Sequence, residues 1–383
     1  MKYLKNKILL SPILFSFFIM GFVDIVGIVT SYVKKDFELS DTLANMLPMM
    51  AFLWFAVISI PTGLLMGKIG RKNTVLFSGF ITIIAMLVPF IDYQFYFILL
   101  AFALLGIGNT ILQVSVPSLL TSVVEKKMIT SVLTLGYFIK AISSFLGPVL
   151  IGVAVICWDN WRYVFLIYAI SVIFSVLWLW FTLIDEKQVT SEQVDSIRQV
   201  VGLLKNKVLL CLFSIILLCV GFEIGLITEA PKYLSQSFQV SLEQSAVGCS
   251  VYYAARTIGT FIGAIVLVRI SSLKFITVSL IGTVIVLICF IMSGSIWMAM
   301  VSLALLGLNF SNVFSITLSI ALQRFPLKTN EISSLMITGI AGGALIPPLL
   351  GILSDVGNQL IGFLFLLLLL LYMLWGIVHV VGK

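Results

Sequence analysis

Long apolar runs separated by short polar segments dominate this chain. Each run reaches about 20 residues, the length at which an α-helix crosses a bilayer core of roughly 30 Å, whereas strands of a membrane barrel would be about half as long. The pattern predicts an all-α membrane protein with twelve transmembrane helices, at residues 9–33, 43–67, 74–91, 95–122, 130–156, 162–184, 208–231, 243–268, 274–293, 296–323, 331–354 and 359–380.

Short motifs return in the second half of the chain. The sequence ALLGI at residues 103–107 reappears as ALLGL at 304–308, 201 positions later, and PVL at 148–150 has a partner in PLL at 348–350. A common offset predicts two homologous halves. We therefore expect three parts: an N-terminal six-helix bundle (1–184), a polar cytoplasmic linker (185–207) and a C-terminal six-helix bundle (208–383).

Composition and charge agree with this topology. Only 10% of the residues are charged, against about 25% in soluble proteins. The net charge of +7 does not indicate nucleic-acid binding, because 17 of the 23 Lys and Arg residues fall at the termini and in alternate loops. Positive charge marks the cytoplasmic side, so both termini are predicted to be cytoplasmic.

The sequence offers no enzyme or cofactor signature. The five cysteines lack metal-type spacing, and no metal ligands cluster within the spans. The single histidine, His379, is expected at the membrane interface. No G-x-x-x-x-G-K-[ST] motif is present, so ATP is not expected to drive the protein. We expect no metal, no cofactor and no enzymatic activity.

The loop GLLMGKIGRK at residues 63–72 resembles the signature of the major facilitator superfamily, with Gly67 where an acidic residue is usual. More narrowly, the chain is similar to the fucose:proton symporter family of bacterial sugar porters, through GFVDIV at 21–26, RTIG at 256–259 and GIAGGALIP at 339–347. The resemblance implies two pseudo-symmetric bundles around a central substrate path. It also implies sugar import with a proton by alternating access.

Charged residues inside predicted spans are the candidates for coupling and binding, because an ionised group at mid-bilayer costs roughly 3 kcal/mol or more. Asp24 is predicted to be the proton site: burial disfavours its charged form, and the resemblance implies an Asp here in proton coupling. The family's second coupling carboxylate, on helix four, has no counterpart, so Glu223 is a candidate for that role.

Two intramembrane cations, Lys140 and Arg256, are candidates for substrate binding. Lys140 would bind a substrate carboxylate, compete with the proton for Asp24, or pair with Glu223. Arg256 offers a planar fork suited to carboxylates or sugar hydroxyls. The alternative is that these charges, together with Glu229, form ion-paired struts between helices.

Amide and aromatic side chains complete the predicted substrate site. Asn309 and Asn312 are three positions apart, and Asn109 and Gln113 four, so each pair is expected to share a helix face. Amides suit sugar hydroxyls because they both donate and accept, although amides that merely bridge helices are common. Tyr137 and Tyr252 would stack on a sugar ring, or would instead face lipid.

Together these features predict a monomeric secondary transporter in a bacterial cytoplasmic (inner) membrane that imports a monosaccharide or sugar derivative by proton symport. Its partners would be the sugar, the proton and the lipid bilayer. The alternatives are efflux of a drug or metabolite by proton antiport on the same fold, and a membrane sensor that does not transport.

Overall fold

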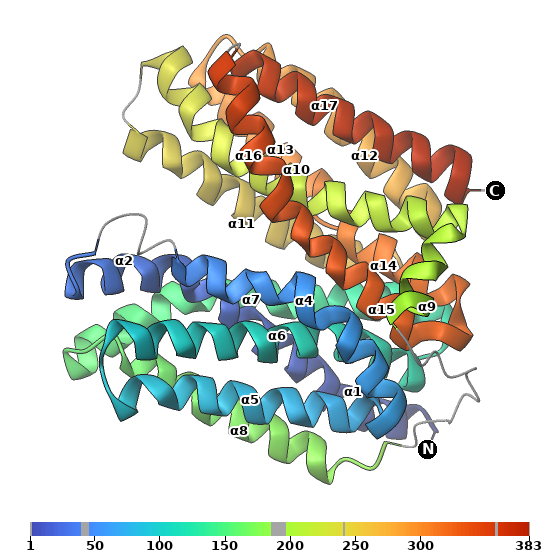
Figure 1. The fold of residues 1–383 in the computed structure, drawn as a ribbon. Coiled ribbons are helices and arrows are strands. Elements are labelled where there is room, and N and C mark those ends of the chain that lie inside the picture. Colours follow the sequence, from blue (N-terminus) through green and yellow to red (C-terminus); the bar gives the residue numbers. More distant parts are fainter. Residues whose placement is uncertain (1, 40–45, 185–196, 240–241, 357–358, 383) are drawn as a thin grey trace. The chain divides into compact units, whose positions relative to one another are not determined.

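The computed structural model describes residues 2–39, 46–184, 197–239, 242–356 and 359–382, and its regular elements there are all helices (Figure 1). Ten described segments are long and apolar enough to cross a membrane, and a shorter apolar helix covers Leu9–Ile25. The first and eleventh predicted spans are interrupted helices, and neither is among those ten.

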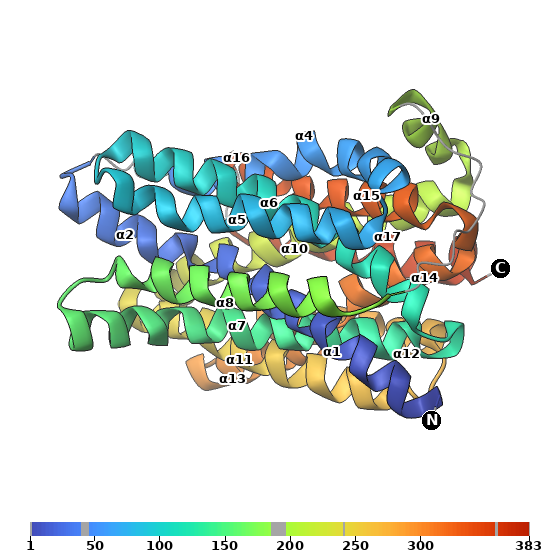
Figure 2. The ribbon, with the colours of Figure 1, turned by 90° about the horizontal axis from the view of Figure 1, so that it is seen from below.

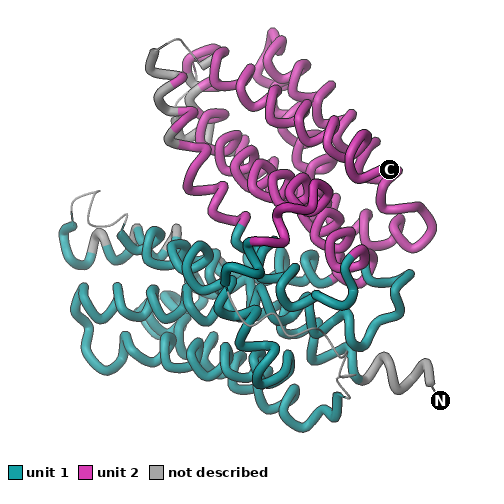
Figure 3. Tube along the Cα trace, turned by 45° about the vertical axis from the view of Figure 1, so that its right-hand side comes forward, with its two compact units in different colours: residues 1–129, 136–201, 325–338 teal, residues 130–135, 202–324, 339–383 magenta. Residues whose placement is uncertain are grey.

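The chain forms two compact units (Figure 3). Unit 1 comprises residues 1–129, 136–201 and 325–338. Its elements are α1 (Lys2–Met20), η1 (Gly21–Ile25), α2 (Val26–Asp36), α4 (Met46–Ile69), α5 (Arg71–Ile91), α6 (Phe95–Val123), η2 (Lys126–Met128), most of α7 (Ile129–Trp158), α8 (Tyr163–Phe181), all but the last residue of α9 (Ile197–Gly202), η4 (Pro326–Lys328) and α15 (Thr329–Thr338). Within it, α5 packs against both α6 and α8, and the α5–α8 neighbours are visible in both ribbon views (Figures 1 and 2).

Unit 2 comprises residues 130–135, 202–324 and 339–383. Its elements are η3 (Leu203–Lys205), α10 (Lys207–Phe238), α11 (Leu242–Val266), α12 (Ser272–Ile291), α13 (Ile296–Phe310), α14 (Val313–Arg324), η5 (Gly339–Ala341), α16 (Gly342–Val356), α17 (Gln359–Gly376) and the π-helical turn η6 (Ile377–Val381). Here α11 packs on α13, and α10 packs on α16 and α17.

The repeated ALLG motif has the same packing role in each unit. A Cβ on Gly106 of α6 would lie 2.4 Å from the Ala51 carbonyl oxygen of α4. A Cβ on Gly307 of α13 would lie 2.3 Å from the Tyr252 carbonyl oxygen of α11. Both distances are too short for a carbon atom, so each glycine allows two helix backbones to touch. The repeat in sequence thus corresponds to a repeat in packing.

Two short segments belong to the compact unit opposite the one that holds their chain neighbours. Residues 130–135, the first turns of α7, are part of unit 2, where Thr130 Oγ1 lies 2.7 Å from Ser319 Oγ and Ser131 donates to the Ala264 carbonyl at 2.5 Å. Conversely, α15 is part of unit 1, where Ser333 donates to the Val114 carbonyl at 2.6 Å. Small hydroxyl residues permit these close crossings and also satisfy backbone groups.

The predicted twelve-helix architecture is confirmed, while the exact bundle boundaries stay a prediction. Most of the predicted linker, residues 185–196, lies outside the described residues. Its described remainder forms the short helix α9 and the 3₁₀ turn η3. The two compact units are not continuous in sequence, because residues 130–135 belong to unit 2 and residues 325–338 to unit 1.

Candidate functional site

The first span of unit 1 is interrupted, and polar side chains lie beside the break. The α-helix α1 ends at Met20, the 3₁₀ turn η1 follows, and α2 resumes at Val26. Asn109 of α6 donates from Nδ2 to the Met20 carbonyl at 2.9 Å, and Gln113 in turn donates to Asn109 Oδ1 at 2.7 Å. Both amides are buried. In this structure their hydrogen bonds therefore hold the interrupted helix.

A row of small residues on α7 sets how closely the broken helix approaches. Cβ atoms placed on Gly136 and Gly147 would collide with Phe17 at 2.7 Å and with Ile25 at 2.5 Å. Between them, a Cβ on Gly21 would lie 2.6 Å from Ser143 Cβ and 2.7 Å from the Lys140 carbonyl. This crossing places Asp24 and Lys140 on adjoining stretches of two packed helices.

Asp24 is exposed and bonded to a hydroxyl group. Its Oδ2 accepts a hydrogen bond of 2.5 Å from Ser144 Oγ, which also lies 3.0 Å from the Lys140 carbonyl oxygen. The predicted burial of Asp24 is wrong: its side chain is exposed, although the other residues of η1 are buried. Among the described residues of unit 1, no Lys or Arg forms an ion pair with Asp24, and Lys140, half-buried, pairs with no carboxylate.

Two further hydroxyl groups line the same crossing. Ser143 Oγ and Tyr168 Oη are buried, and neither has a hydrogen-bond partner among the described residues. The Tyr168 ring stacks on Phe22 with centroids 3.8 Å apart, and its hydroxyl would be 3.2 Å from a Cβ on Gly147. Sequence reasoning missed Ser143, Ser144 and Tyr168, since nothing in their spacing distinguishes them from other small or aromatic residues of a span.

Unit 2 holds its intramembrane charges differently. Arg256 Nε lies 2.8 Å from Glu223 Oε1, joining α11 to α10, with side chains 33% and 14% exposed. This pair corresponds to the predicted strut for Arg256. Tyr252, one turn before Arg256, is completely buried, and its hydroxyl has no hydrogen-bond partner in the described structure. Glu229 is also buried.

The expectation that Asn309 and Asn312 share a helix face is wrong. The helix ends at Phe310 and restarts at Val313, so the interval of three residues is not helical. Asn309 lies against Gly282 of α12 and donates to its own-helix Leu305 carbonyl at 2.8 Å. Asn312 is buried against α11 and donates to the Gly259 carbonyl at 2.8 Å.

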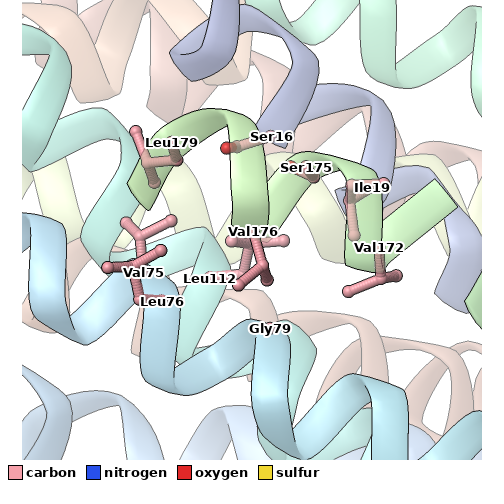
Figure 4. A pocket seen from close by; sticks show the side chains of 10 residues that line it. All are labelled: Ser16, Ile19, Val75, Leu76, Gly79, Leu112, Val172, Ser175, Val176 and Leu179. Atoms are coloured by element: carbon pink, nitrogen blue, oxygen red, sulfur yellow. The ribbon is translucent and has the colours of Figure 1, made fainter. Parts of the chain in front are cut away.

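The remaining aromatic candidate, Tyr137, packs edge-on against Phe17 at 5.5 Å between ring centroids. A small cavity in unit 1 contains none of the predicted site residues (Figure 4). Its lining is almost entirely apolar, formed by Ser16, Ile19, Val75, Leu76, Gly79, Leu112, Val172, Ser175, Val176 and Leu179. We therefore do not assign it to a sugar.

In the signature loop at residues 63–72, the Arg71 guanidinium forms hydrogen bonds to uncharged side chains. Arg71 donates to Asn330 Oδ1 at 2.8 Å, to Ser122 Oγ at 2.6 Å and to Thr329 Oγ1 at 2.5 Å. Ser118 Oγ also donates to Asn330 Oδ1, at 2.8 Å. These bonds attach α15 to α5 and α6, in a loop whose usual acidic position holds Gly67.

A polar cluster at the far end of α2 lies outside the spans. Asp36 Oδ2 accepts from the Tyr93 hydroxyl at 2.5 Å and from Trp161 Nε1 at 3.0 Å. Burial, and then the hydrogen bond to Asp36, raise the pKa of Tyr93 well above its usual value. The phenol therefore stays protonated and remains a donor across the physiological range.

These features define a multi-pass membrane protein built from two helical units, and the comparisons place it in a family. Residues 12–328 match the Major Facilitator Superfamily, and the chain belongs to that superfamily. It is thus a member of a transporter superfamily and not an enzyme.

The similarity to individual proteins is low in sequence but extends over most of the chain. The chain is 25% identical over 366 residues to a glucose/galactose transporter of Brucella abortus, covering 91% of this chain and 88% of the relative. It is likewise 25% identical to a putative glucose/galactose transporter of Helicobacter pylori, covering 93% and 91%. The crystal structure of the E. coli fucose:proton symporter superposes with a TM-score of 0.81 at 14% identity, covering 96% and 97%. The predicted resemblance to that family is confirmed at the level of the fold.

Proposed function

We propose that this protein is a secondary active transporter that imports a monosaccharide or sugar derivative together with a proton by alternating access. Membership of the superfamily supports transport, and the names of the Brucella and Helicobacter relatives support a sugar. The name of the E. coli structural neighbour supports proton coupling.

The observation that carries the proposal is the environment of Asp24. A hydroxyl group donates to a carboxylate and accepts from a carboxylic acid, so Ser144 stays hydrogen-bonded in both protonation states of Asp24. An arginine partner would instead lose its counter-charge on protonation. Asp24 is also exposed, so a proton can reach it. We assign Asp24 as the coupling site.

Glu223, the other predicted coupling residue, has the opposite environment. Its ion pair with Arg256 stabilises the charged carboxylate, and protonation would leave the guanidinium unbalanced. We propose that Glu223 remains ionised through the cycle and orients Arg256. The Arg256 edge that does not face Glu223 is then available for sugar hydroxyls, whereas the completely buried Tyr252 is not.

We further propose that the protein acts as a monomer in a bacterial inner membrane with both termini in the cytoplasm. The distribution of Lys and Arg supports this orientation, and the bacterial relatives support the location. Reaction of single cysteines placed near Lys2 and Lys383 with an impermeant thiol reagent tests it. Labelling in intact cells would contradict the orientation.

Uptake into proteoliposomes tests the main proposal. A panel of fucose, glucose, galactose, N-acetylglucosamine and sialic acid is measured with and without an inward proton gradient. We expect one sugar class to accumulate only with the gradient. D24N is expected to abolish accumulation but to retain exchange of labelled for unlabelled sugar, and E125Q, in an exposed loop, serves as the matched control.

The outcomes separate the alternatives. Accumulation by D24N equal to that of the control would overturn the assignment of Asp24. Sugar binding without any exchange would favour a sensor. Acidification-driven extrusion of a non-sugar compound, with no sugar uptake by folded protein, would favour efflux.

A further inference from the structure

Lys140 is the intramembrane cation that the proposed mechanism leaves without a role. It is half-buried in the middle of α7, and no hydrogen bond or ion pair of its ammonium group joins it to the described residues of unit 1. Arg256, by contrast, is neutralised by Glu223. A protein seldom retains an unbalanced charge in a membrane span unless a substrate or ion pathway uses it.

The geometry keeps Lys140 close to Asp24 without joining them. Ser144, one turn after Lys140, donates to the Asp24 carboxylate, and Gly21 of the broken helix lies directly on the Lys140 carbonyl. The other polar groups described at this crossing, Asn109, Ser143 and Tyr168, carry no charge at neutral pH. Asp24 and Lys140 therefore determine the net charge of this part of unit 1.

Counting that charge through the transport cycle shows which substrate fits. At this crossing, the charges of ionised Asp24 and Lys140 sum to zero in the empty carrier. Protonation of Asp24 leaves a net charge of +1. A neutral sugar would then have to cross with an unbalanced cation, which a low-dielectric membrane disfavours. A substrate with one negative charge returns the charge at this crossing to zero.

Resting on the function proposed above, we propose that the substrate is a monosaccharide carrying one carboxylate, and that this carboxylate binds the Lys140 ammonium group. A sugar phosphate is disfavoured, because a phosphate monoester carries about −1.5 to −2 charges at pH 7 and would overshoot the balance. The crossing is neutral in two states, when it is empty and when it is loaded with both the proton and the anion. Both half-loaded states are charged, and this couples the two substrates.

Uptake of paired acidic and neutral sugars tests the inference. Glucuronate, galacturonate and N-acetylneuraminate are compared with glucose and galactose under an inward proton gradient. We expect at least one acid to accumulate at least tenfold more than its neutral counterpart. One proton and one monoanion carry no net charge, so an inside-negative potential set with valinomycin and potassium is expected to leave the initial rate unchanged.

Variants of Lys140 separate a binding role from a structural one. K140Q is expected to lower uptake of the acidic sugar at least tenfold, whereas K140R retains most of it because a cation is preserved. K126Q, in an exposed loop, is the control. In wild-type protein, competition between acidic and neutral sugars provides a measurement that does not depend on how well the variants fold.

Accumulation of a neutral sugar in preference to every acid, or uptake accelerated by the negative potential, would overturn the inference while leaving sugar:proton symport intact. Unchanged uptake of the acid by K140Q would overturn the role of Lys140. Absence of uptake of every sugar, acidic or neutral, by folded protein would instead remove the proposed function itself.

Discussion

Asp24 and Lys140 lie at one helix crossing of unit 1 without forming an ion pair, whereas Glu223 and Arg256 of unit 2 approach to 2.8 Å. An ion pair joined by a direct hydrogen bond fixes both groups in their charged forms. A carboxylate held by a hydroxyl is free to change its protonation state. In the mechanism proposed above, unit 1 therefore carries the charge changes of the cycle and unit 2 supplies a constant electrostatic background.

Removing one partner of the unit 2 pair is expected to have the largest effect on stability. R256Q leaves a mostly buried carboxylate without its counter-charge, at a cost of about 3 kcal/mol. Thermal unfolding in detergent measures the loss. The double variant E223Q/R256Q serves as the control and should recover much of it; equal instability of the single and double variants would show that the ion pair is not the cause.

Loss of the amide that holds the helix break should have an intermediate effect. N109L removes the donor to the Met20 carbonyl and leaves Gln113 without its acceptor, which costs about 1–2 kcal/mol. Unfolding and initial uptake rates are measured together. Because the break positions Asp24, we expect N109L to lose gradient-driven accumulation while it still binds the substrate. Accumulation equal to that of the wild type would show that the break is not needed to position the proton site.

D24N itself should cost less than about 1 kcal/mol in stability, because the side chain is exposed and an amide still accepts from Ser144. A melting temperature close to the wild-type value, combined with lost accumulation, is the expected pattern. A large drop in stability would place Asp24 with Glu223 as a structural charge and would erase the contrast between the units.

The smallest effect is expected at Asn309. Its amide donates within its own helix, and N309A should change stability by less than about 0.5 kcal/mol and leave the substrate affinity unaltered. Equilibrium binding of the transported sugar provides the measurement. A clear loss of affinity would return Asn309 to the substrate site that the sequence predicted.

The spans and the repeat were predictable because they depend on local information. A membrane helix needs only a run of apolar residues, and the glycines of the ALLG motif mark close packing wherever they occur. Asp24, Lys140, Glu223 and Arg256 were likewise identifiable from the sequence, since charge within an apolar run is conspicuous.

The partners of these residues were not predictable, because they depend on which helices meet. From the sequence, either Lys140 or Arg256 could have been the partner of Glu223. In the structure, Arg256 of α11 forms the ion pair with that carboxylate. The shared face expected for Asn309 and Asn312 assumed an unbroken helix, and no proline or glycine between them signals the interruption. Ser144 carries no distinguishing signal in the sequence, because serines are common in membrane helices.

The position of α15 in unit 1 has a consequence for biosynthesis. When the ribosome has completed residues 1–201, the surfaces of α4 and α6 that pack against α15 are still uncovered. The hydrogen bonds of Arg71 and Ser118 to Asn330 cannot form yet, because Asn330 has not been synthesised. The nascent N-terminal half must therefore remain in the membrane with these groups uncovered until more than a hundred further residues have been inserted. Maturation of the first unit is thus a late event, completed only by the penultimate span.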